Sequence, residues 1–458
     1  MSSLLPPSGS SSYSDAPPPT LSATTSSEGM EDALFGGESF EVEVVSTGTD
    51  KKGTRASAAA NLANSTIGAG LLALPIVLKY AGVIPGVLCI LIMGGMADFS
   101  LNLLTQLAST LPPGRQTYED LGGILLGGRA GTKLVEISTL GINFGAITAY
   151  VIILGDMIVP VVRWVADVDD GENPFWASRV FLTLLAATSC MLPLSLLRRI
   201  TSLRFASMLS LTMVVVFVVV VLFDASTKSP SSHLEGRHED ISWFRLSSDI
   251  FKGIPLITFA FACHTNLYPV LAEMPSLTGF SAAIHASTTT CAVLYILTAV
   301  AGYVSFLSET KGDLLVGYPD DSVLFNLVRM LFCVTMVLTY PLAGYPVRVA
   351  LDRMLFPSAS RELTRARLVG ETVGYWLASV ALALAIPKVT VVFGLIGATA
   401  SSFTSYIIPG AAYLRSPHIT HSLSKRVGAW ALIVLGVVLG TTSTIVILIG
   451  AFSDEEDE

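Results

Sequence analysis

Ala60-Asn-Leu-Ala-Asn-Ser-Thr-Ile-Gly-Ala-Gly-Leu-Leu-Ala-Leu-Pro75 interrupts the first long apolar segment of the chain with a polar run and two glycines. Glycine is conformationally permissive and proline removes a hydrogen-bond donor, so a helix can unwind here. Inside a membrane, unwound backbone is tolerated only where it packs against protein or lines a cavity. The stretch therefore predicts a broken membrane helix at Gly68-Ala69-Gly70.

The composition of the whole chain places it in lipid. Of its 458 residues, 52% are hydrophobic and only 14% are charged, and the mean hydropathy is +0.65. A soluble globular protein carries about 25% charged residues. A membrane-spanning helix needs roughly 20 apolar residues, and the apolar runs here do not alternate as the strands of a membrane barrel do. The sequence thus predicts an all-α polytopic membrane protein with eleven spans, near 56–80, 83–110, 134–162, 175–196, 201–223, 250–272, 282–306, 322–345, 368–386, 389–413 and 426–452.

Several function classes are disfavoured. The five cysteines all lie in apolar segments, and their spacing matches neither a metal site nor an extracellular disulfide framework. The net charge of −8 is concentrated in loops and tails, so it gives no sign of nucleic-acid binding. We find no nucleophile elbow, phosphate loop or metal motif in the sequence. We therefore expect neither an enzyme with catalytic residues nor a bound cofactor.

The two ends of the chain differ from its middle. Residues 1–50 are rich in Ser, Thr, Pro and acidic residues and lack the features of a signal peptide, so we expect a disordered tail. Residues 51–452 form the expected transmembrane domain, and 453–458 are a short acidic tail. More than half of the Lys and Arg residues fall on one side if the N-terminus is cytosolic, which is the orientation that the positive-inside rule favours.

The sixth segment is also interrupted. It reads Phe259-Ala-Phe-Ala-Cys-His-Thr-Asn-Leu-Tyr-Pro-Val-Leu-Ala-Glu273, where a polar run is followed by Pro269. Segments one and six are corresponding members of two five-helix halves, and matched interruptions in two halves are the best sequence pointer to a transporter site. A channel fits such a pair of breaks less well than alternating access does.

The matched breaks predict a substrate site. Backbone amides that open a half-helix can hold a carboxylate, and unwound carbonyls can hold a cation. The alternative is that the two glycines merely allow helices to pack closely. The substrate-binding candidates are Asn64, Ser65, Gly68, Ala69, Gly70, Cys263, His264, Thr265 and Asn266.

Segment eight offers hydroxyl groups to a cation. Thr335 and Thr339 are four residues apart and share one helix face, and small hard cations prefer oxygen ligands. Each hydroxyl could instead bond back to its own helix. The ion-binding candidates, for Na⁺, are Asn64, Ile67, Thr335 and Thr339.

Three ionisable residues are candidates for proton binding or gating. Asp98 lies inside segment two, where a charged residue is a functional candidate by default, or else a structural hydrogen-bonder. His264 could titrate near neutral pH or serve only as a hydrogen-bonding group. Glu273, at the cytosolic side of segment six, could close a gate by pairing with an Arg, or could be solvated.

These stretches resemble a known family, the amino acid/auxin permeases, which includes sodium-coupled neutral amino acid transporters and fungal vacuolar amino acid transporters. The resemblance covers about residues 52–452. It is carried by the first-helix motif quoted above, by Asp98-Phe-Ser-Leu-Asn-Leu-Leu104, by Thr117-Tyr-Glu-Asp-Leu-Gly122 in the loop that follows, by Phe261-Ala-Cys-His-Thr-Asn266, and by Tyr340-Pro341 through Arg348.

The resemblance implies a leucine-transporter-type fold, with a 5+5 inverted repeat plus one extra helix and an amino acid held at the two breaks. In sodium-coupled relatives an Asn of helix one and a Thr of helix eight help hold the ion, and by motif these match Asn64 and Thr339, with Thr335 an alternative. Ala69 stands where many relatives have Ser, and Asn102 where many have a basic residue, so the choice of substrate stays open.

Two function hypotheses follow. The first is a secondary active amino acid transporter, coupled to Na⁺ or H⁺, for neutral amino acids, in a vacuolar, lysosomal or plasma membrane. The second is a membrane receptor that binds an amino acid and signals through its N-terminal tail. The substrate and the bilayer are the expected partners, and the oligomeric state is left open.

Overall fold

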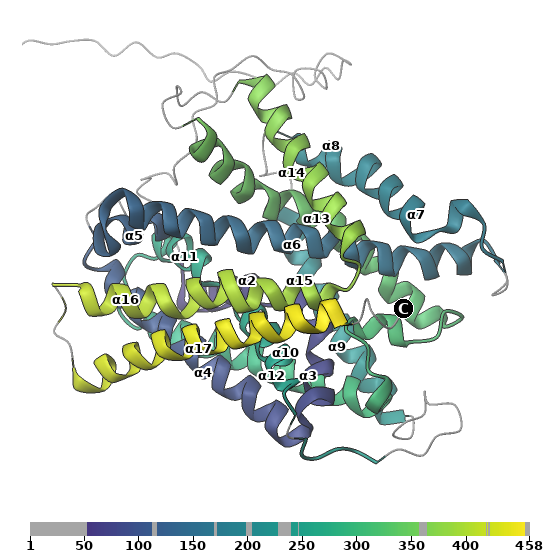
Figure 1. Cartoon of the computed structure of the whole chain (residues 1–458), viewed down its shortest axis with the longest axis horizontal. Helices are drawn as coiled ribbons and strands as arrows, with labels where there is room; N and C mark the ends of the chain where they lie inside the picture. The colour runs from purple at the N-terminus through teal and green to yellow at the C-terminus, as the bar shows by residue number, and fades with distance from the viewer. Residues whose placement is uncertain are drawn as a thin grey trace, which may run out of the picture. The chain divides into compact units, whose positions relative to one another are not determined.

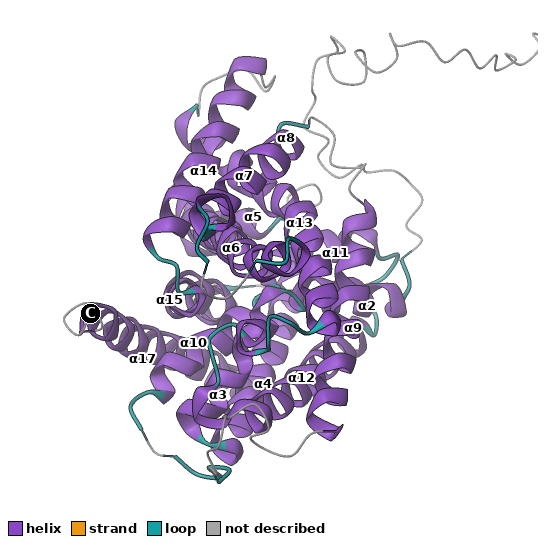
Figure 2. Cartoon of the chain, turned by 90° about the vertical axis from the view of Figure 1, so that its right-hand side faces the viewer, coloured by secondary structure: helices purple, strands orange, loops and turns teal. Residues whose placement is uncertain are grey.

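The computed structural model describes residues 53–111, 117–168, 172–197, 204–227, 240–245, 247–356, 364–417, 419 and 422–453. Over these residues the protein consists of helices and connecting loops without a strand (Figures 1 and 2). The expected tail over 1–50 and residues 454–458 lie outside the described residues.

In the described part of the chain, helices occupy the positions of all eleven expected spans, and nine or ten of these helices have the length and hydropathy of a membrane span. Nine helices are long and apolar enough to span a membrane, a tenth span is a pair of helices bent at a break, and Arg179–Ser195 is a shorter apolar helix. The spans are α2/η1/α3 (Arg55–Thr66, Ala69–Ala73, Leu74–Ala81), α4 (Val83–Ala108), α6 (Gly128–Val165), α7/η3/α8 (Arg179–Ala186, Ala187–Met191, Leu192–Ser195), α9 (Arg204–Thr227), α10/η5/α11 (Ile250–Ala260, His264–Asn266, Leu267–Glu273), α12 (Phe280–Phe306), α13 (Val323–Leu355), α14 (Arg365–Ala385), α15/η8/η9/α16 (Val389–Ile396, Gly397–Ser401, Phe403–Ile407, Ile408–Arg415) and α17 (Leu423–Ser453).

Two elements differ from the sequence-based expectation. The sequence predicts that the eighth span ends near residue 345, yet α13 continues to Leu355 through Pro341 and Pro346. Hydropathy marks where the chain leaves the apolar layer, and a helix can continue into the polar layer beyond it. The stretch that starts at Thr117 is expected to be a loop but forms helix α5 (Tyr118–Leu126), because Thr117 and Asp120 make a reciprocal capping box.

The two interrupted spans lie at the centre of the bundle. Helix α12 packs against α2, α3 and α4, and α10 packs against α3, η1 and α4. On the other side, α6 packs against α13, α14 and α15 (Figure 1). Three further 3₁₀ helices, η2 (Phe175–Ala177), η6 (Leu307–Glu309) and η7 (Leu314–Gly317), lie in the connections between spans.

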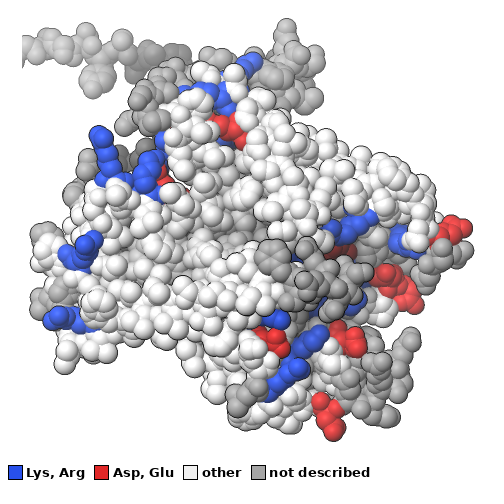
Figure 3. Space-filling model, in the orientation of Figure 1, with Lys and Arg blue, Asp and Glu red and all other residues white. Residues whose placement is uncertain are grey.

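The surface of the bundle is apolar along the spans. Large hydrophobic side chains are exposed on several helices, among them Ile92 of α4, Val219 of α9 and Ile449 of α17. On the face drawn in Figure 3, charged side chains gather toward the margins, and a broad uncharged band lies between them. Such a band is the surface that lipid tails require.

Candidate functional site

The first span breaks where the sequence predicts. Helix α2 ends at Thr66, Ile67 turns to an extended conformation (φ −77°, ψ 111°), and Gly68 precedes η1. The two halves of the span meet at an angle of 53°. Gly68 provides no side-chain cap for η1, and the first amides of a helix have no partner inside it. The break therefore presents the backbone of Ala69 and Gly70 to the interior.

The sixth span is interrupted at the same level of the bundle. Phe261 to Cys263 leave the helical conformation between α10 and η5, and Cys263 provides no side-chain cap for η5. The two breaks approach closely, because a methyl group added to Gly70 would meet the Cα and Cβ of Ala260 at 3.3 Å. The matched interruptions of the sequence are therefore neighbours in space.

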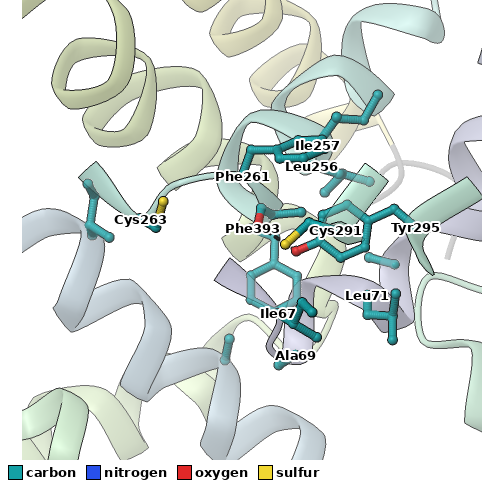
Figure 4. Close-up of a cluster of buried hydrophobic side chains, with 14 of the residues drawn as sticks. Ile67, Ala69, Leu71, Leu256, Ile257, Phe261, Cys263, Cys291, Tyr295 and Phe393 are labelled. Carbon is teal, nitrogen blue, oxygen red and sulfur yellow. Dashed lines mark hydrogen bonds between the residues drawn. The ribbon is translucent and has the colours of Figure 1, made fainter. Parts of the chain in front are cut away.

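Tyr295 of α12 ties the two broken helices together. Its hydroxyl donates to the carbonyl oxygen of Thr66 at 2.8 Å and to that of Ala260 at 2.7 Å. A tyrosine hydroxyl has one hydrogen, so the two helix ends share it. The ring packs edge-on against Phe261, with 5.0 Å between centroids. Figure 4 shows the Tyr295 side chain among residues from both breaks.

Replacing Tyr295 with phenylalanine is expected to destabilise the protein by roughly 1–3 kcal/mol, because two buried carbonyl groups lose their donor. The melting temperature of the purified protein measures this loss. Tyr303→Phe is a matched control on the same helix, since its hydroxyl accepts a hydrogen bond from one loop amide, Ser242 N, at 3.2 Å. Equal melting temperatures for wild type and Tyr295→Phe would contradict the assignment.

A cavity of about 430 Å³ opens beside the first break. Its wall is formed by residues of both broken spans together with residues of α6, α9 and α13. The volume falls in the range of about 300–1,000 Å³ that is usual for small-molecule sites. Of the residues that the sequence marks as binding candidates, the cavity is lined by Asn64, Ser65, Ile67, Gly68, Ala69, Gly70, Thr265, Asn266, Thr335 and Thr339.

The remaining candidates lie elsewhere. Cys263 is buried outside the lining of the cavity, and His264 points to α4, where its Nε2 lies 2.6 Å from Ser100 Oγ. Asp98 contacts α12, with His285 Nδ1 and Thr288 Oγ1 each 2.8 Å from its Oδ1. Sequence order within a single turn of 3₁₀ helix does not reveal which residue faces the cavity.

Glu273 lies at the end of α11, away from the cavity. Its carboxylate accepts a hydrogen bond from Asn61 Nδ2 at 3.4 Å, and its carbonyl accepts one from Gly53 N at 3.2 Å. An Arg partner for it is not found among the described residues. The contact joins the start of the first span to the end of the sixth, and the gating role of Glu273 stays a prediction.

Four polar residues of the wall are absent from the sequence-based candidates: Thr66 at the first break, whose hydroxyl donates to Leu62 O at 2.8 Å, and three residues of other helices. Asn143 and Tyr150 come from α6, and Ser210 comes from α9. They carry no charge and lie away from both helix breaks in the sequence, which are the two signals that mark the other candidates. Asn143 could have been found from the sequence, because it is an amide within an apolar segment and polar groups in a span face the protein interior.

The two threonines of α13 bond to their own helix. Thr335 Oγ1 donates to Leu331 O at 2.8 Å, and Thr339 Oγ1 donates to Thr335 O at 2.7 Å. This is the back-bonding that competes with a ligand role. It uses the hydroxyl hydrogens, however, so the oxygen lone pairs of both residues can still accept a ligand.

The opposite end of the first span is covered by the connection between α12 and α13. Helix η7 of this connection contacts η1 and α6, and Lys79 Nζ donates to Thr310 O at 3.1 Å. Asp313 starts η7 by accepting a hydrogen bond from Leu315 N at 3.0 Å. Its carboxyl is buried, and burial together with the nearby negative charge of Asp156 raises its pKa from 3.8 to about 8.

Comparison with known proteins identifies the family. Residues 51–449 match the family model described as transmembrane amino acid transporter protein. The chain is 28% identical to the amino acid transporter AVT6B of Arabidopsis thaliana over 411 residues, which is 82% of this chain and 86% of that protein.

Two further relatives come from other eukaryotes. Vacuolar amino acid transporter 2 of Saccharomyces cerevisiae is 28% identical over 412 residues, covering 87% of this chain and 84% of that protein. Putative sodium-coupled neutral amino acid transporter 11 of Rattus norvegicus is 29% identical over 392 residues, covering 85% of this chain and 83% of that protein.

The fold also matches a solved structure. MhsT, crystallised in complex with L-phenylalanine, superposes with a TM-score of 0.53 over 88% of this chain and 100% of its own, at 11% sequence identity. The bundle therefore has the leucine-transporter-type fold that the family resemblance implies. Since the family model spans nearly the whole helical region, this chain belongs to the transmembrane amino acid transporter protein family.

Proposed function

We propose that this protein is a secondary active transporter that carries a neutral amino acid together with a cation through the cavity between the two broken helices. The observation that carries the proposal is the cavity itself, which joins residues of both breaks to Thr335 and Thr339 of α13. Membership of the family supports the amino acid as substrate.

The backbone of the first break would bind the substrate carboxylate. The amides that open η1 carry the positive end of the helix dipole, which favours an anion. The α-amino group would meet the carbonyls at the end of α2 and the side chains of Asn64 and Thr265, which lie in the same wall. In this position both charges of the zwitterion are stabilised by dipoles of the protein.

The lining of the cavity favours a neutral side chain. None of the described residues that line it carries a charge. Burying an ionised group without a partner costs several kcal/mol, so a Lys, Arg, Asp or Glu substrate would bind poorly. Phe259, Phe332 and Met336 in the wall offer apolar contacts to an apolar side chain.

The same lining supports sodium as the coupled cation. Among the described residues, its polar groups are oxygens and amides, and it holds no carboxylate or imidazole that could carry a proton. The hydroxyl oxygens of Thr335 and Thr339, with Asn64 and the carbonyl of Ile67, would supply oxygen ligands of the kind that a small hard cation takes.

Purified protein in liposomes should accumulate a labelled neutral amino acid when a sodium gradient is imposed, and much less when only a pH gradient is imposed. Uptake driven by protons alone would overturn the sodium coupling. The absence of uptake under either gradient, for a panel of neutral amino acids, would overturn the transport mechanism as a whole.

Replacing Thr339 with alanine is expected to raise the sodium concentration needed for half-maximal uptake by about tenfold, because one oxygen ligand is lost. Sodium titration of the initial uptake rate measures the change. Thr444→Ala of α17 is the matched control, since the Thr444 hydroxyl also bonds back to its own helix, at Gly440 O, but lies outside the cavity. An unchanged sodium dependence in Thr339→Ala would contradict the assignment.

We also propose that the N-terminus lies in the cytosol and that the membrane is vacuolar, lysosomal or plasma. The orientation rests on the distribution of Lys and Arg residues. The name of the yeast relative favours a vacuolar membrane. A fluorescent fusion observed in cells locates the protein, and protease protection of an N-terminal tag determines the orientation.

A further inference from the structure

A second cavity lies on the flank of the bundle, apart from the cavity of about 430 Å³ beside the first break, which we call the central cavity. It measures about 860 Å³ and is formed by α6, α13 and α14, which pack against one another (Figure 1). We call it the flank groove. It opens on the surface of the spans, since Ile137, Leu355 and Gly374 along it are exposed. The described residues of the flank groove and of the central cavity do not overlap.

The flank groove is about as deep as one leaflet of a bilayer. Along α14 it extends from Ala366 to Ala378, which at 1.5 Å per residue is about 18 Å. Half of a hydrocarbon core is about 15 Å. The walls are apolar over this length, with Leu140, Phe144 and Leu351 among the lining residues. An acyl chain that stands upright in one leaflet matches this shape.

Missing side chains create the space. Gly370 and Gly374, one turn apart on α14, both line the flank groove, and a methyl group added to either would meet no atom within 4 Å. Alanine is a better helix former than glycine by about 1 kcal/mol. Two glycines facing an unfilled apolar surface thus keep open a volume that ordinary helix-forming residues would occupy.

One end of the flank groove is charged. Arg367 lines it, pairs with Asp352 and stacks over Phe356 at 4.5 Å from the ring centroid. Arg365 lies two residues away at the start of α14. This end adjoins the connection between α13 and α14, where the chain leaves the membrane. An anionic group would therefore find the Arg367 guanidinium at the mouth of the flank groove, where its Nε has no hydrogen-bond acceptor among the described residues.

A buried carboxylate lies just below these arginines. Glu371 lines the flank groove and is 7% exposed, and neither of its carboxylate oxygens accepts a hydrogen bond from the described residues. The carboxyl of Asp352 on α13 is close enough to share a proton with it, and the nearby positive charges are Arg367 of its own helix and Arg348 of α13. A carboxylate buried without a hydrogen-bond donor is costly, so the site favours a ligand that supplies N–H groups.

We propose that the flank groove binds an aminophospholipid of the adjoining leaflet, with one acyl chain between α6, α13 and α14, its phosphate at Arg367 and its ammonium at Glu371. The ammonium group brings three hydrogen-bond donors to an acceptor that has none. Phosphatidylcholine has the same charges and chains but no N–H, and a sterol has no phosphate. The chemistry of the mouth thus selects a primary amine.

Native mass spectrometry of the purified full-length protein tests the proposal. The protein is titrated with phosphatidylethanolamine or phosphatidylcholine of identical acyl chains, or with cholesterol. We expect one retained phosphatidylethanolamine with an affinity about tenfold above that of phosphatidylcholine, the ratio that charge-assisted hydrogen bonds supply. Equal retention of the two phospholipids, or preferential retention of cholesterol, would overturn it.

Three variants connect the bound lipid to the flank groove. Gly374→Leu fills the groove without a backbone clash and should lower the affinity for phosphatidylethanolamine about tenfold. Glu371→Gln should remove the preference between the two phospholipids while both still bind. Gly95→Leu on the exposed face of α4, where an added methyl group also meets no atom, is the matched control and should bind as wild type does.

If Gly374→Leu melts well below the wild type, Gly370→Leu replaces it, since the two glycines line the same groove. Full retention of the lipid by a folded groove-filling variant would show that the lipid binds elsewhere and would overturn the proposal. Because the readout is lipid mass, failure of the proposed transport function would leave this result unaffected.

Discussion

Replacing Gly68 with leucine is expected to abolish amino acid uptake, by at least about a hundredfold, while the protein keeps its thermal stability. Gly68 lines the central cavity, and a methyl group built on it meets no atom within 4 Å. Its backbone is extended (φ −151°, ψ −155°) and lies outside the region with positive φ that favours glycine. A leucine side chain would therefore extend into the cavity of about 430 Å³ and occupy the position of the substrate.

The neighbouring glycine provides the contrast. At Gly70 an added methyl group would meet Ala260 at 3.3 Å, so Gly70→Leu should lower the melting temperature as well as uptake. Gly95→Leu on the exposed face of α4 controls for adding leucine to a membrane span. Initial uptake rates in liposomes, with melting curves of each variant, separate the outcomes. Substantial uptake by a folded Gly68→Leu protein would exclude this cavity as the substrate site.

Replacing Asp313 with asparagine is expected to remove a strong dependence of stability on pH. The carboxyl of Asp313 has a pKa raised from 3.8 to about 8, first because it is buried and second because of Asp156. Between these two values the folded protein holds a proton that the unfolded chain has released. The free energy of unfolding therefore falls as pH rises through this window, by up to about 1.4 kcal/mol per pH unit.

Asparagine is uncharged at every pH, and it retains an oxygen that can accept the hydrogen bond from Leu315 N. Melting curves between pH 5 and pH 8 should fall steeply for the wild type and less steeply for Asp313→Asn, with the largest difference at pH 8. Asp321→Asn changes an exposed acid of the same connection and should preserve the wild-type slope. Parallel curves for wild type and Asp313→Asn would contradict the assignment.

The positions of the helical spans follow from the sequence because hydropathy measures the partition of a segment into lipid. The break at Gly68 is also visible there, since glycines and a proline near polar residues oppose a continuous helix. The end of α13 is not visible in this way, because Leu355 lies beyond the apolar layer and the helix simply continues.

The direction in which each side chain points could not be predicted from the sequence and is known only from the structure. His264 and Thr265 are adjacent in sequence, yet one contacts Ser100 and the other lines the central cavity. Tyr295 lies in an apolar span without a sequence motif around it, and its role depends on two carbonyl groups from distant segments. Glu371 is likewise an ordinary helix residue until the groove beside it is seen.

The shared hydroxyl of Tyr295 has a mechanical consequence. Any displacement of α2 against α10 must break one of its two hydrogen bonds and leave a carbonyl group unsatisfied inside the bundle. We therefore expect α2, α10 and α12 to move together as one rigid body. This group of helices would then move against α6 and α13, and the central cavity lies at that boundary. A rigid-body movement of this kind would open and close the cavity while the backbone geometry of both breaks stays constant.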